Sequence, residues 1–300
     1  MEPSGVLVIN KQEGMTSHDV VNRIRRLYAT KRVGHTGTLD PLATGVLTVL
    51  VGRAAKAAEY LTADTKAYTA TLRLGITTDT EDVTGSVLTS CEDIPSKEAV
   101  LEAVKSFEGD IMQIPPMYSA LKVDGQKLCD LARKGVSVER AARPITIYSI
   151  EAVPTDSETD YTLRVSCSSG TYIRTLCADI GKKLGCGGVM ATLRRDKAGL
   201  FELESSYTLA ELEELDADKR FALLKPTEEL FSSFPAVKLA QFYEKLSRSG
   251  CEIYQKKIGT SFALGERVRL CSQSGEFYAL GEVKEYENGS AIKSIKMFDI

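Results

Sequence analysis

One twelve-residue stretch constrains this chain more than any other: Gly34-His35-Thr36-Gly37-Thr38-Leu39-Asp40-Pro41-Leu42-Ala43-Thr44-Gly45. It leads into the apolar run 46–51, which predicts a strand buried on both faces. Pro41 disfavours helical geometry at Asp40 and has no N–H to bond the Asp40 carboxylate. Two interpretations follow. The stretch is either an Asx turn between two elements or a loop that presents one acid from a core strand.

The sequence contains few other residues that could act in catalysis together with Asp40. The chain has no P-loop, dinucleotide-binding or G-x-S-x-G motif. Its seven cysteines form no C-x-x-C pair and its histidines are only two, which argues against a zinc site and a disulfide framework. No second Asp follows Asp40 closely enough to hold Mg²⁺, and this disfavours a metal-dependent phosphotransferase. A nucleophilic carboxylate remains, and it would need a neighbouring cation to stay ionised.

Charge and length bound the class of protein. The net charge of −3 over 300 residues counts against a nucleic-acid partner. Basic side chains nevertheless cluster in 21–33 and in 182–197, and each cluster is either a solvated face or a local RNA-binding face. No run of 18 apolar residues and no secretory leader is present, so we expect a cytoplasmic chain with no membrane partner.

Hydrophobic periodicity predicts an α+β fold with a mixed, largely antiparallel sheet and flanking helices. The predicted strands are 6–10, 46–51, 66–75, 145–150 and 161–167, and residues 191–196 lead to a further strand. The polar segment 77–85 is predicted to be a loop. The predicted helices begin at Thr16 or Ser17, at Ser96, in 168–175 and at Thr208. The last of them is rich in acidic residues and is predicted to end at Leu224. A boundary near 230 precedes three short strands, 265–270, 277–283 and 292–298, which predict a small β-barrel-like module.

Three motifs in order carry a resemblance. They are the opening stretch, Leu74-Gly75-x-x-Thr78-Asp79-Thr80-x-Asp82, and Gly170-Thr171-Tyr172-Ile173-Arg174. Together they resemble the bacterial tRNA pseudouridine-55 synthases, the TruB family of pseudouridine synthases. The resemblance implies a catalytic domain over 1–230, with an RNA-contacting insertion at about 114–145, and a PUA-like RNA-binding domain over 235–300. One departure is visible: Gln12 stands after Lys11, where the family usually has proline.

The resemblance also implies roles around the target uridine. Asp40 would be the attacking nucleophile, with attack at C1′ or C6 left open. Arg174 would pair with Asp40 and lower its pKa, and Asp82 would be a second partner of Arg174. The other side chains would contact the flipped nucleotide: Tyr68 as a stacking ring, Tyr172 as a wall, Leu193 as an apolar floor and His35 near the displaced nucleotides.

The implied activity is the conversion of uridine-55 in the tRNA T-stem-loop to pseudouridine. The nucleotide must be flipped out of the folded loop, which costs a few kcal/mol that stacking offsets. Neither metal nor organic cofactor is expected, nor an obligate protein partner, so we expect a monomer. The basic residues of the insertion would contact phosphates: Lys122, Lys127, Lys134, Arg140 and Arg143. The alternative is a non-catalytic tRNA-folding chaperone, which would not require Asp40, Arg174 and Tyr68 together.

Overall fold

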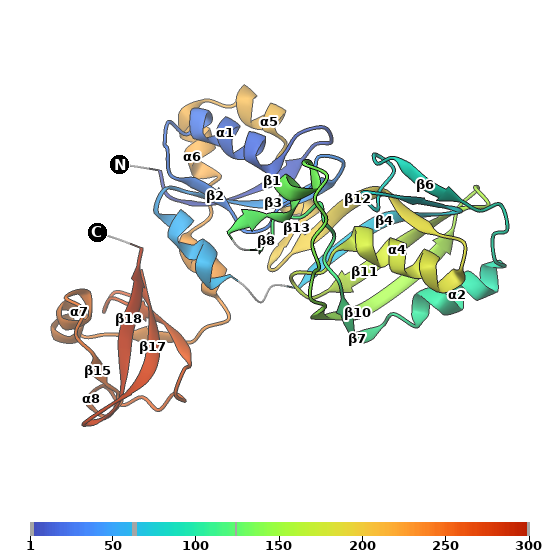
Figure 1. Cartoon of the computed structure of the whole chain (residues 1–300). Helices are drawn as coiled ribbons and strands as arrows, with labels where there is room; N and C mark the ends of the chain where they lie inside the picture. The colour runs from blue at the N-terminus through green and yellow to red at the C-terminus, as the bar shows by residue number, and fades with distance from the viewer. Residues whose placement is uncertain (1–2, 62–64, 124, 299–300) are drawn as a thin grey trace.

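The computed structural model describes residues 3–61, 65–123 and 125–298. Half of the strands in these residues belong to one nine-stranded sheet (Figure 1). Seven of them follow the order β1-β3-β12-β4-β11-β10-β7, while β2 pairs with β3 and β13 with β12. Among the strand pairings that the described residues make in this sheet, only that of β12 with β3 is parallel, so the expected mixed, largely antiparallel α+β fold is confirmed. The strands are β1 (Gly5–Lys11), β2 (Val33–His35), β3 (Thr44–Val51), β4 (Lys66–Leu74), β7 (Gly109–Gln113), β10 (Arg143–Pro154), β11 (Asp160–Cys167), β12 (Gly188–Ala198) and β13 (Phe201–Glu202).

Three helices of this part were predicted and are confirmed: α1 (Ser17–Leu27), α2 (Lys97–Lys105) and α4 (Ile173–Leu184). A capping box between Thr16 and Asp19 starts α1. α2 and α4 lie together against the same part of the sheet (Figure 1). Shorter elements complete this part: η1 (Gly52–Tyr60), β5 (Ile76–Thr78), β6 (Val87–Ser90), β8 (Lys122–Val123), β9 (Gln126–Lys127), α3 (Leu128–Ala132), η2 (Leu203–Ser205), α5 (Leu209–Glu214), α6 (Ala217–Ala222) and η3 (Thr227–Phe231).

Two expectations about local structure were wrong. The acidic helix predicted from Thr208 to Leu224 is two helices, because Leu215 is extended and the Asp216 carboxylate caps a new helix by accepting from the Lys219 N–H at 2.8 Å. The segment 77–85 is not loop throughout, since its first residues belong to β5, which pairs with β6. Within the described residues, no helix has the length and apolar character needed to cross a membrane.

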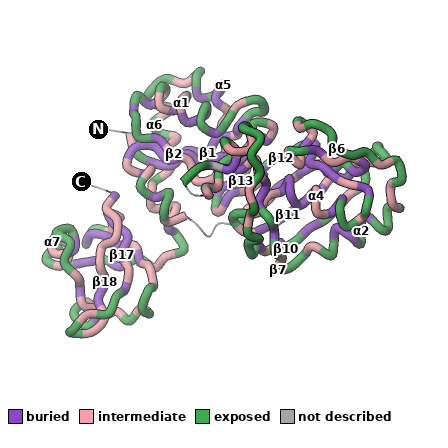
Figure 2. The backbone as a smooth tube through the Cα atoms, viewed as in Figure 1, coloured by how far each residue is buried: buried purple, intermediate pink, exposed green. Residues whose placement is uncertain are grey.

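The strand that follows the opening loop is buried on both faces, as its sequence predicts. Leu47, Val49 and Val51 of β3 belong to one core cluster, which also holds α1 and α4 side chains. Val46 and Leu50 point the other way, into a second cluster. Figure 2 shows the buried stretch at β1, the strand that pairs with β3 along its whole length. The loop that precedes β3 is therefore anchored to the most buried strand of the chain.

The C-terminal residues form a second sheet in the order β14-β16-β17-β18-β15, and its three predicted strands are confirmed. Two short helices within it were not predicted. The elements are β14 (Ala236–Lys238), α7 (Gln241–Arg248), β15 (Ile253–Tyr254), α8 (Gln255–Ile258), β16 (Arg267–Cys271), β17 (Phe277–Tyr286) and β18 (Gly289–Met297). Leu280 and Phe298 share a core cluster with Ala57 of η1 and Phe231 of η3, and the Phe231 ring contacts the rings of Phe277 and Phe298, so this module packs against η1 and η3.

Candidate active site

Asp40 lies in the loop between β2 and β3, and two buried side chains hold the backbone beside it. Ser17 Oγ accepts from the Leu39 N–H at 2.8 Å and donates to the Leu39 carbonyl at 3.0 Å. Lys11 Nζ, at the end of β1, donates to the carbonyls of Met15 (2.8 Å), Gln12 (2.9 Å) and Pro41 (3.3 Å). Burial lowers the pKa of Lys11 to about 8, while the Asp40 carboxylate acts in the opposite direction.

Arg195 of β12 holds the same loop from the other side. Its guanidinium donates to the carbonyls of Val46 (2.7 Å), Gly37 (3.1 Å) and Thr38 (3.4 Å). Gly45 allows the backbone of the loop to lie close to the backbone of Arg195. Its φ is +96°, and a Cβ added there would lie 2.3 Å from the Arg195 carbonyl oxygen. The backbone is thus fixed on both sides of Asp40, and the loop is more than a polar turn.

The Asp40 carboxylate itself points to Arg174 near the start of α4. Arg174 Nε lies 2.9 Å from Asp40 Oδ2, and the Arg174 side chain is 6% exposed whereas that of Asp40 is 37% exposed. The Asp40 carbonyl accepts from the Ala43 N–H at 3.0 Å, but within the described residues the Asp40 carboxylate accepts no hydrogen bond from a backbone N–H, so the Asx-turn interpretation was wrong. A substrate can reach the carboxylate from solvent, and its cation lies behind it.

Arg174 is oriented by backbone carbonyls and a second acid. It donates to the carbonyls of Tyr118 (2.7 Å) and Thr80 (3.1 Å), and its Nη1 lies 3.7 Å from Asp82 Oδ2. Asp82 is buried, and its Oδ1 accepts from the Thr84 N–H (2.9 Å) and hydroxyl (2.5 Å) and from the Thr80 hydroxyl (2.9 Å). The structure therefore brings Asp40, Arg174 and Asp82 together.

The net pKa shift of Asp40 differs from the simple ion-pair expectation. Desolvation raises the pKa of Asp40 above its ordinary value, and Asp82 adds to the rise. Arg174 and Lys11 act in the opposite direction without cancelling it. A sequence identifies the partners of such a pair, whereas the desolvation depends on how the surrounding atoms pack.

Tyr68 and Leu193, which the resemblance assigns to the nucleotide pocket, lie on the neighbouring strands β4 and β12. On β4 and β12, Arg195 is in register with Tyr68 and Leu193 with Ala70. Tyr68 is 7% exposed and Leu193 is 9% exposed, and both belong to the core cluster on the α4 side of the sheet. Burial raises the pKa of Tyr68, and the nearby charge of Arg195 acts in the opposite direction. The Tyr68 hydroxyl is therefore protonated at neutral pH.

Tyr172 caps α4 two residues before Arg174. Its backbone is clamped by Gln113, a buried residue of β7: the Tyr172 N–H donates to Gln113 Oε1 at 2.8 Å, and Gln113 Nε2 donates to the Tyr172 carbonyl at 3.0 Å. Burial raises the pKa of Tyr172. The amide clamp fixes the start of the helix that carries Arg174.

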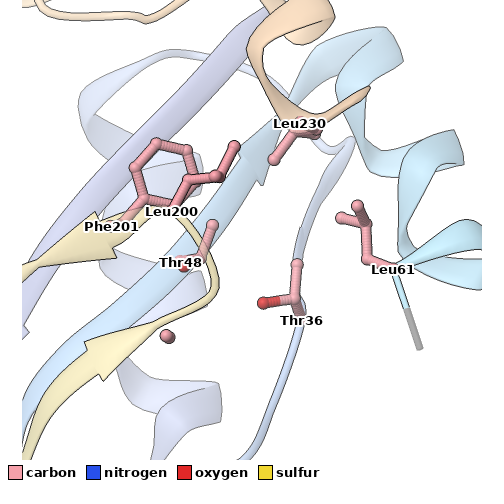
Figure 3. A pocket seen from close by; sticks show the side chains of 7 residues that line it. Thr36, Thr48, Leu61, Leu200, Phe201 and Leu230 are labelled. Atoms are coloured by element: carbon pink, nitrogen blue, oxygen red, sulfur yellow. The ribbon is translucent and has the colours of Figure 1, made fainter. Parts of the chain in front are cut away.

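His35 ends β2, where it pairs with Val49 of β3. Its Nδ1 is buried and has no hydrogen-bond partner. Burial, followed by the charge of Arg195, lowers the pKa of His35, so its imidazole is neutral at pH 7. A small pocket lies beside the next residue, Thr36, between side chains that include Leu200 and Phe201 (Figure 3). Its volume of about 10 Å³ has room for about one water and none for a nucleobase.

The predicted phosphate contacts of the insertion are placed only in part. Arg143 is exposed at the start of β10, and Lys134 is exposed after α3. Arg140 is half-buried, and its Nε has no hydrogen-bond partner. Lys122 and Lys127 belong to β8 and β9, but their side chains lie outside the described residues.

Sequence analysis missed the side chains that hold the site: Lys11, Ser17, Gln113 and Arg195. Arg195 was assigned with its neighbours to a basic cluster, yet it is 2% exposed and faces the core. The signal was present in both strands. Lys11 follows the buried Leu7 and Ile9 with period two, and Arg195 follows Leu193 in the same way. In the part of the chain that the structure describes, no cluster of His, Cys, Asp and Glu could hold a metal ion.

Comparison with known proteins gives consistent matches. Residues 25–173 match the family model of the TruB family pseudouridylate synthase N-terminal domain, and residues 174–232 match that of the tRNA pseudouridylate synthase B C-terminal domain. The chain is 42% identical over 295 residues to tRNA pseudouridine synthase B of Clostridium kluyveri, covering 98% of this chain and 99% of the relative. It is 50% identical over 234 residues to that of Dechloromonas aromatica, covering 78% of each. A chain in the crystal structure of a Cbf5–Nop10–Gar1 complex is 26% identical, with a TM-score of 0.75 over 98% of this chain and 85% of that one.

Proposed function

This chain belongs to the TruB family of pseudouridylate synthases, and we propose that it isomerises uridine 55 in the T-stem-loop of tRNA with Asp40 as the nucleophile. It is a tRNA pseudouridine synthase, like its curated relatives. One observation carries the assignment of the nucleophile. A solvent-accessible carboxylate is held by a rigid loop, and its partner is a buried arginine.

The reaction moves one bond. The glycosidic bond between C1′ and N1 breaks, a bond between C1′ and C5 forms, C5 loses a proton and N1 gains one, so the atoms balance without a co-reactant. In the proposed mechanism the Asp40 carboxylate attacks the uridine and frees the base from its N1 link. The base then turns within the pocket and rejoins through C5, and the bond between Asp40 and the nucleotide breaks, which restores the carboxylate. A carboxylate can perform this covalent step only when it is ionised.

Arg174 supplies the charge that the ionised form needs. Desolvation alone would keep Asp40 protonated over a wider pH range, and a guanidinium 2.9 Å away opposes that effect. Because Arg174 also donates to two backbone carbonyls and lies near Asp82, it cannot swing away with the substrate. The cation is thus in place before the uridine arrives, which avoids reorganisation during the reaction.

The pocket around the carboxylate suits a flipped base. We assign the stacking surface to Tyr68, the wall to Tyr172 and the apolar floor to Leu193, since aromatic and apolar contacts offset the cost of unstacking. The neutral imidazole of His35, with its unpartnered Nδ1, would meet the displaced nucleotides. Arg140, Arg143, Lys122 and Lys127 of the insertion would contact backbone phosphates.

The remaining parts of the proposal concern the whole chain. Residues 1–230 would form the catalytic domain, and the sheet module at 235–300 would be a PUA-type RNA-binding domain. The enzyme would act in the cytoplasm as a monomer, without a metal, an organic cofactor or an obligate protein partner. The tRNA would then span both parts of the molecule, the T-stem-loop lying at Asp40.

A tritium-release assay tests this function. The substrates are two tRNA transcripts that carry 5-tritiated uridine, one with uridine at position 55 and one with cytidine there. We expect release of one tritium per molecule from position 55 and none from the second transcript beyond the blank. Equal release from both would overturn the assignment of position 55, and no release from either would overturn the isomerase activity.

A further inference from the structure

Arg195 occupies a special place in the main sheet. β12 lies between β3 and β4, and in this strand Arg195 is in register with Gly45 on one side and with Tyr68 on the other. Gly45 ends the loop that carries the proposed nucleophile, and Tyr68 is the proposed stacking ring. One residue is therefore adjacent, through the backbone, to both halves of the proposed site.

The side chain of Arg195 joins the same two halves. Three of its N–H groups donate to the carbonyls of Gly37, Thr38 and Val46, which lie before and after Asp40 in the chain. On its other side Arg195 is the register partner of Tyr68, and its charge lowers the pKa of the Tyr68 hydroxyl against the rise that burial causes. Because a guanidinium is planar and rigid, its three contacts fix the loop relative to β12, and the β12–β4 pairing places Tyr68 beside it.

Arg195 differs from an arginine that binds RNA or forms an ordinary ion pair. Its side chain is 2% exposed, and within the described residues it takes part in no ion pair. Its neighbour Arg194 points to the opposite face of the strand, is 52% exposed and pairs with Asp196 at 2.6 Å. Burying a cation costs free energy unless its N–H groups are hydrogen-bonded. Among the described residues, Arg195 is buried without an ion pair and donates to backbone carbonyls of the loop, which indicates that its role is geometric.

We propose that Arg195 is a positioning residue for the isomerisation: its guanidinium holds the Asp40 loop against Tyr68, so that nucleophile and stacking ring meet one uridine in reactive geometry. The inference rests on the proposed function of this site. Arg195 touches neither substrate nor carboxylate, so it acts through the groups that it holds. A misplacement of about 1 Å can slow a reaction by about 100-fold, and lysine cannot replace the fork because it offers a point charge.

The test uses the full chain with tRNA under single-turnover conditions. Arg195→Lys keeps the charge, Arg195→Gln keeps two donors without it, and Arg194→Lys is the matched control on the exposed face. We expect the maximal rate of tritium release to fall by about 30- to 100-fold in the first two variants. The tRNA dissociation constant should change less than threefold in them, and the control should match the wild type. Near-UV circular dichroism and thermal unfolding report whether each variant is folded at the assay temperature.

A second readout separates positioning from stability. Combining Arg195→Lys with Tyr68→Phe should slow the reaction at least fivefold less than the product of the two single effects, because the two residues are register partners and act on the same geometry. Multiplicative effects, a near-normal rate in Arg195→Lys, or weakened tRNA binding at a normal rate would each overturn the proposal. So would loss of native structure in both Arg195 variants. If the wild type itself releases no tritium, the proposed function has failed instead.

Discussion

Two segments are proposed to meet the RNA, and the structure holds them in opposite ways. The loop around Asp40 is fixed by side chains that are almost fully buried, Lys11, Ser17 and Arg195. In its described residues, the insertion at 114–145 contains a five-residue helix, a two-stranded hairpin and the first residues of β10, and residues 133–137 are all exposed. Its ion pair between Arg133 and Asp130 is exposed and 3.6 Å long.

The difference matches what each segment is proposed to do. A nucleophile must be placed within about 0.5 Å before the substrate arrives, so its supporting side chains have to be locked by packing. A surface that contacts phosphates gains from adaptable side chains, since it reads charge and shape. Changes in the loop should therefore lower the rate constant, whereas changes in the insertion should weaken tRNA binding.

The largest effect among the supporting residues is expected for Arg174→Met. The change leaves Asp40 and Asp82 without their shared cation, and breaking a buried pair costs about 3–5 kcal/mol. Because Asp40 is partly exposed, the lower half of that range applies, and kcat/KM should fall by roughly 10²–10³-fold. Arg73→Met is the control, because it removes an exposed pair with Asp160 and should change kcat/KM less than twofold. Similar rates in the two variants would contradict the role of Arg174.

Substitution of one glycine in each segment compares the rigidity of the two segments directly. Gly45→Ala puts a Cβ 2.3 Å from the Arg195 carbonyl at a φ of +96°, whereas Gly135→Ala in the insertion has a φ of +73° but open space around it. The first should lower the free energy of unfolding by about 3 kcal/mol or more, and the second by about 1 kcal/mol. Urea denaturation monitored by circular dichroism measures both values. Equal losses would mean that the loop tolerates movement.

The pH dependence of the rate tests the electrostatics of the loop. Asp40 must be ionised, and burial raises its pKa, so activity should be lost as the pH falls through a value above the ordinary aspartate pKa. Asp82→Asn removes a negative charge that adds to this rise and should move the acid limb to lower pH. Single-turnover rates at constant ionic strength give the profile. An acid limb that Asp82→Asn leaves unmoved, or moves upward, would contradict the proposed network.

The smallest effect is expected in the insertion, for Arg143→Ala. Loss of one phosphate contact should weaken tRNA binding by about fivefold and reduce the slope of log K against log salt by about 1. The rate at saturating tRNA should change less than twofold. Filter binding over a range of salt concentrations measures the slope. A lower saturating rate with unchanged binding would place Arg143 with the catalytic residues instead.

Much of this architecture was predictable, and the exceptions have physical reasons. Local periodicity was enough to predict β3 and the helix that carries Arg174. The resemblance was enough to predict that Asp40 pairs with Arg174. The Asp216 cap that breaks the acidic helix was readable as a start signal but was outweighed by the surrounding helix formers. The pKa direction of Asp40 was not readable, because desolvation depends on distant parts of the chain.

The supporting residues show a different limit. Lys11 and Arg195 sit at inward positions of their strands, but a charged side chain in such a position is ordinarily assigned to the surface. What makes them tolerable is a set of backbone carbonyls from the loop, and those partners are up to 158 residues away in the chain. Sequence periodicity indicates that such a side chain points inward, and only the fold supplies the acceptors that explain it.

The central claim, that Asp40 is the nucleophile, is tested most directly by Asp40→Asn in single-turnover tritium release. The matched control is Asp130→Asn in the insertion, an exposed acid that should leave the rate unchanged. An amide of the same shape cannot attack, so the rate should fall at least about 10⁴-fold, while the tRNA dissociation constant stays within threefold of the wild type. Release from Asp40→Asn at a rate near that of the control would contradict the claim.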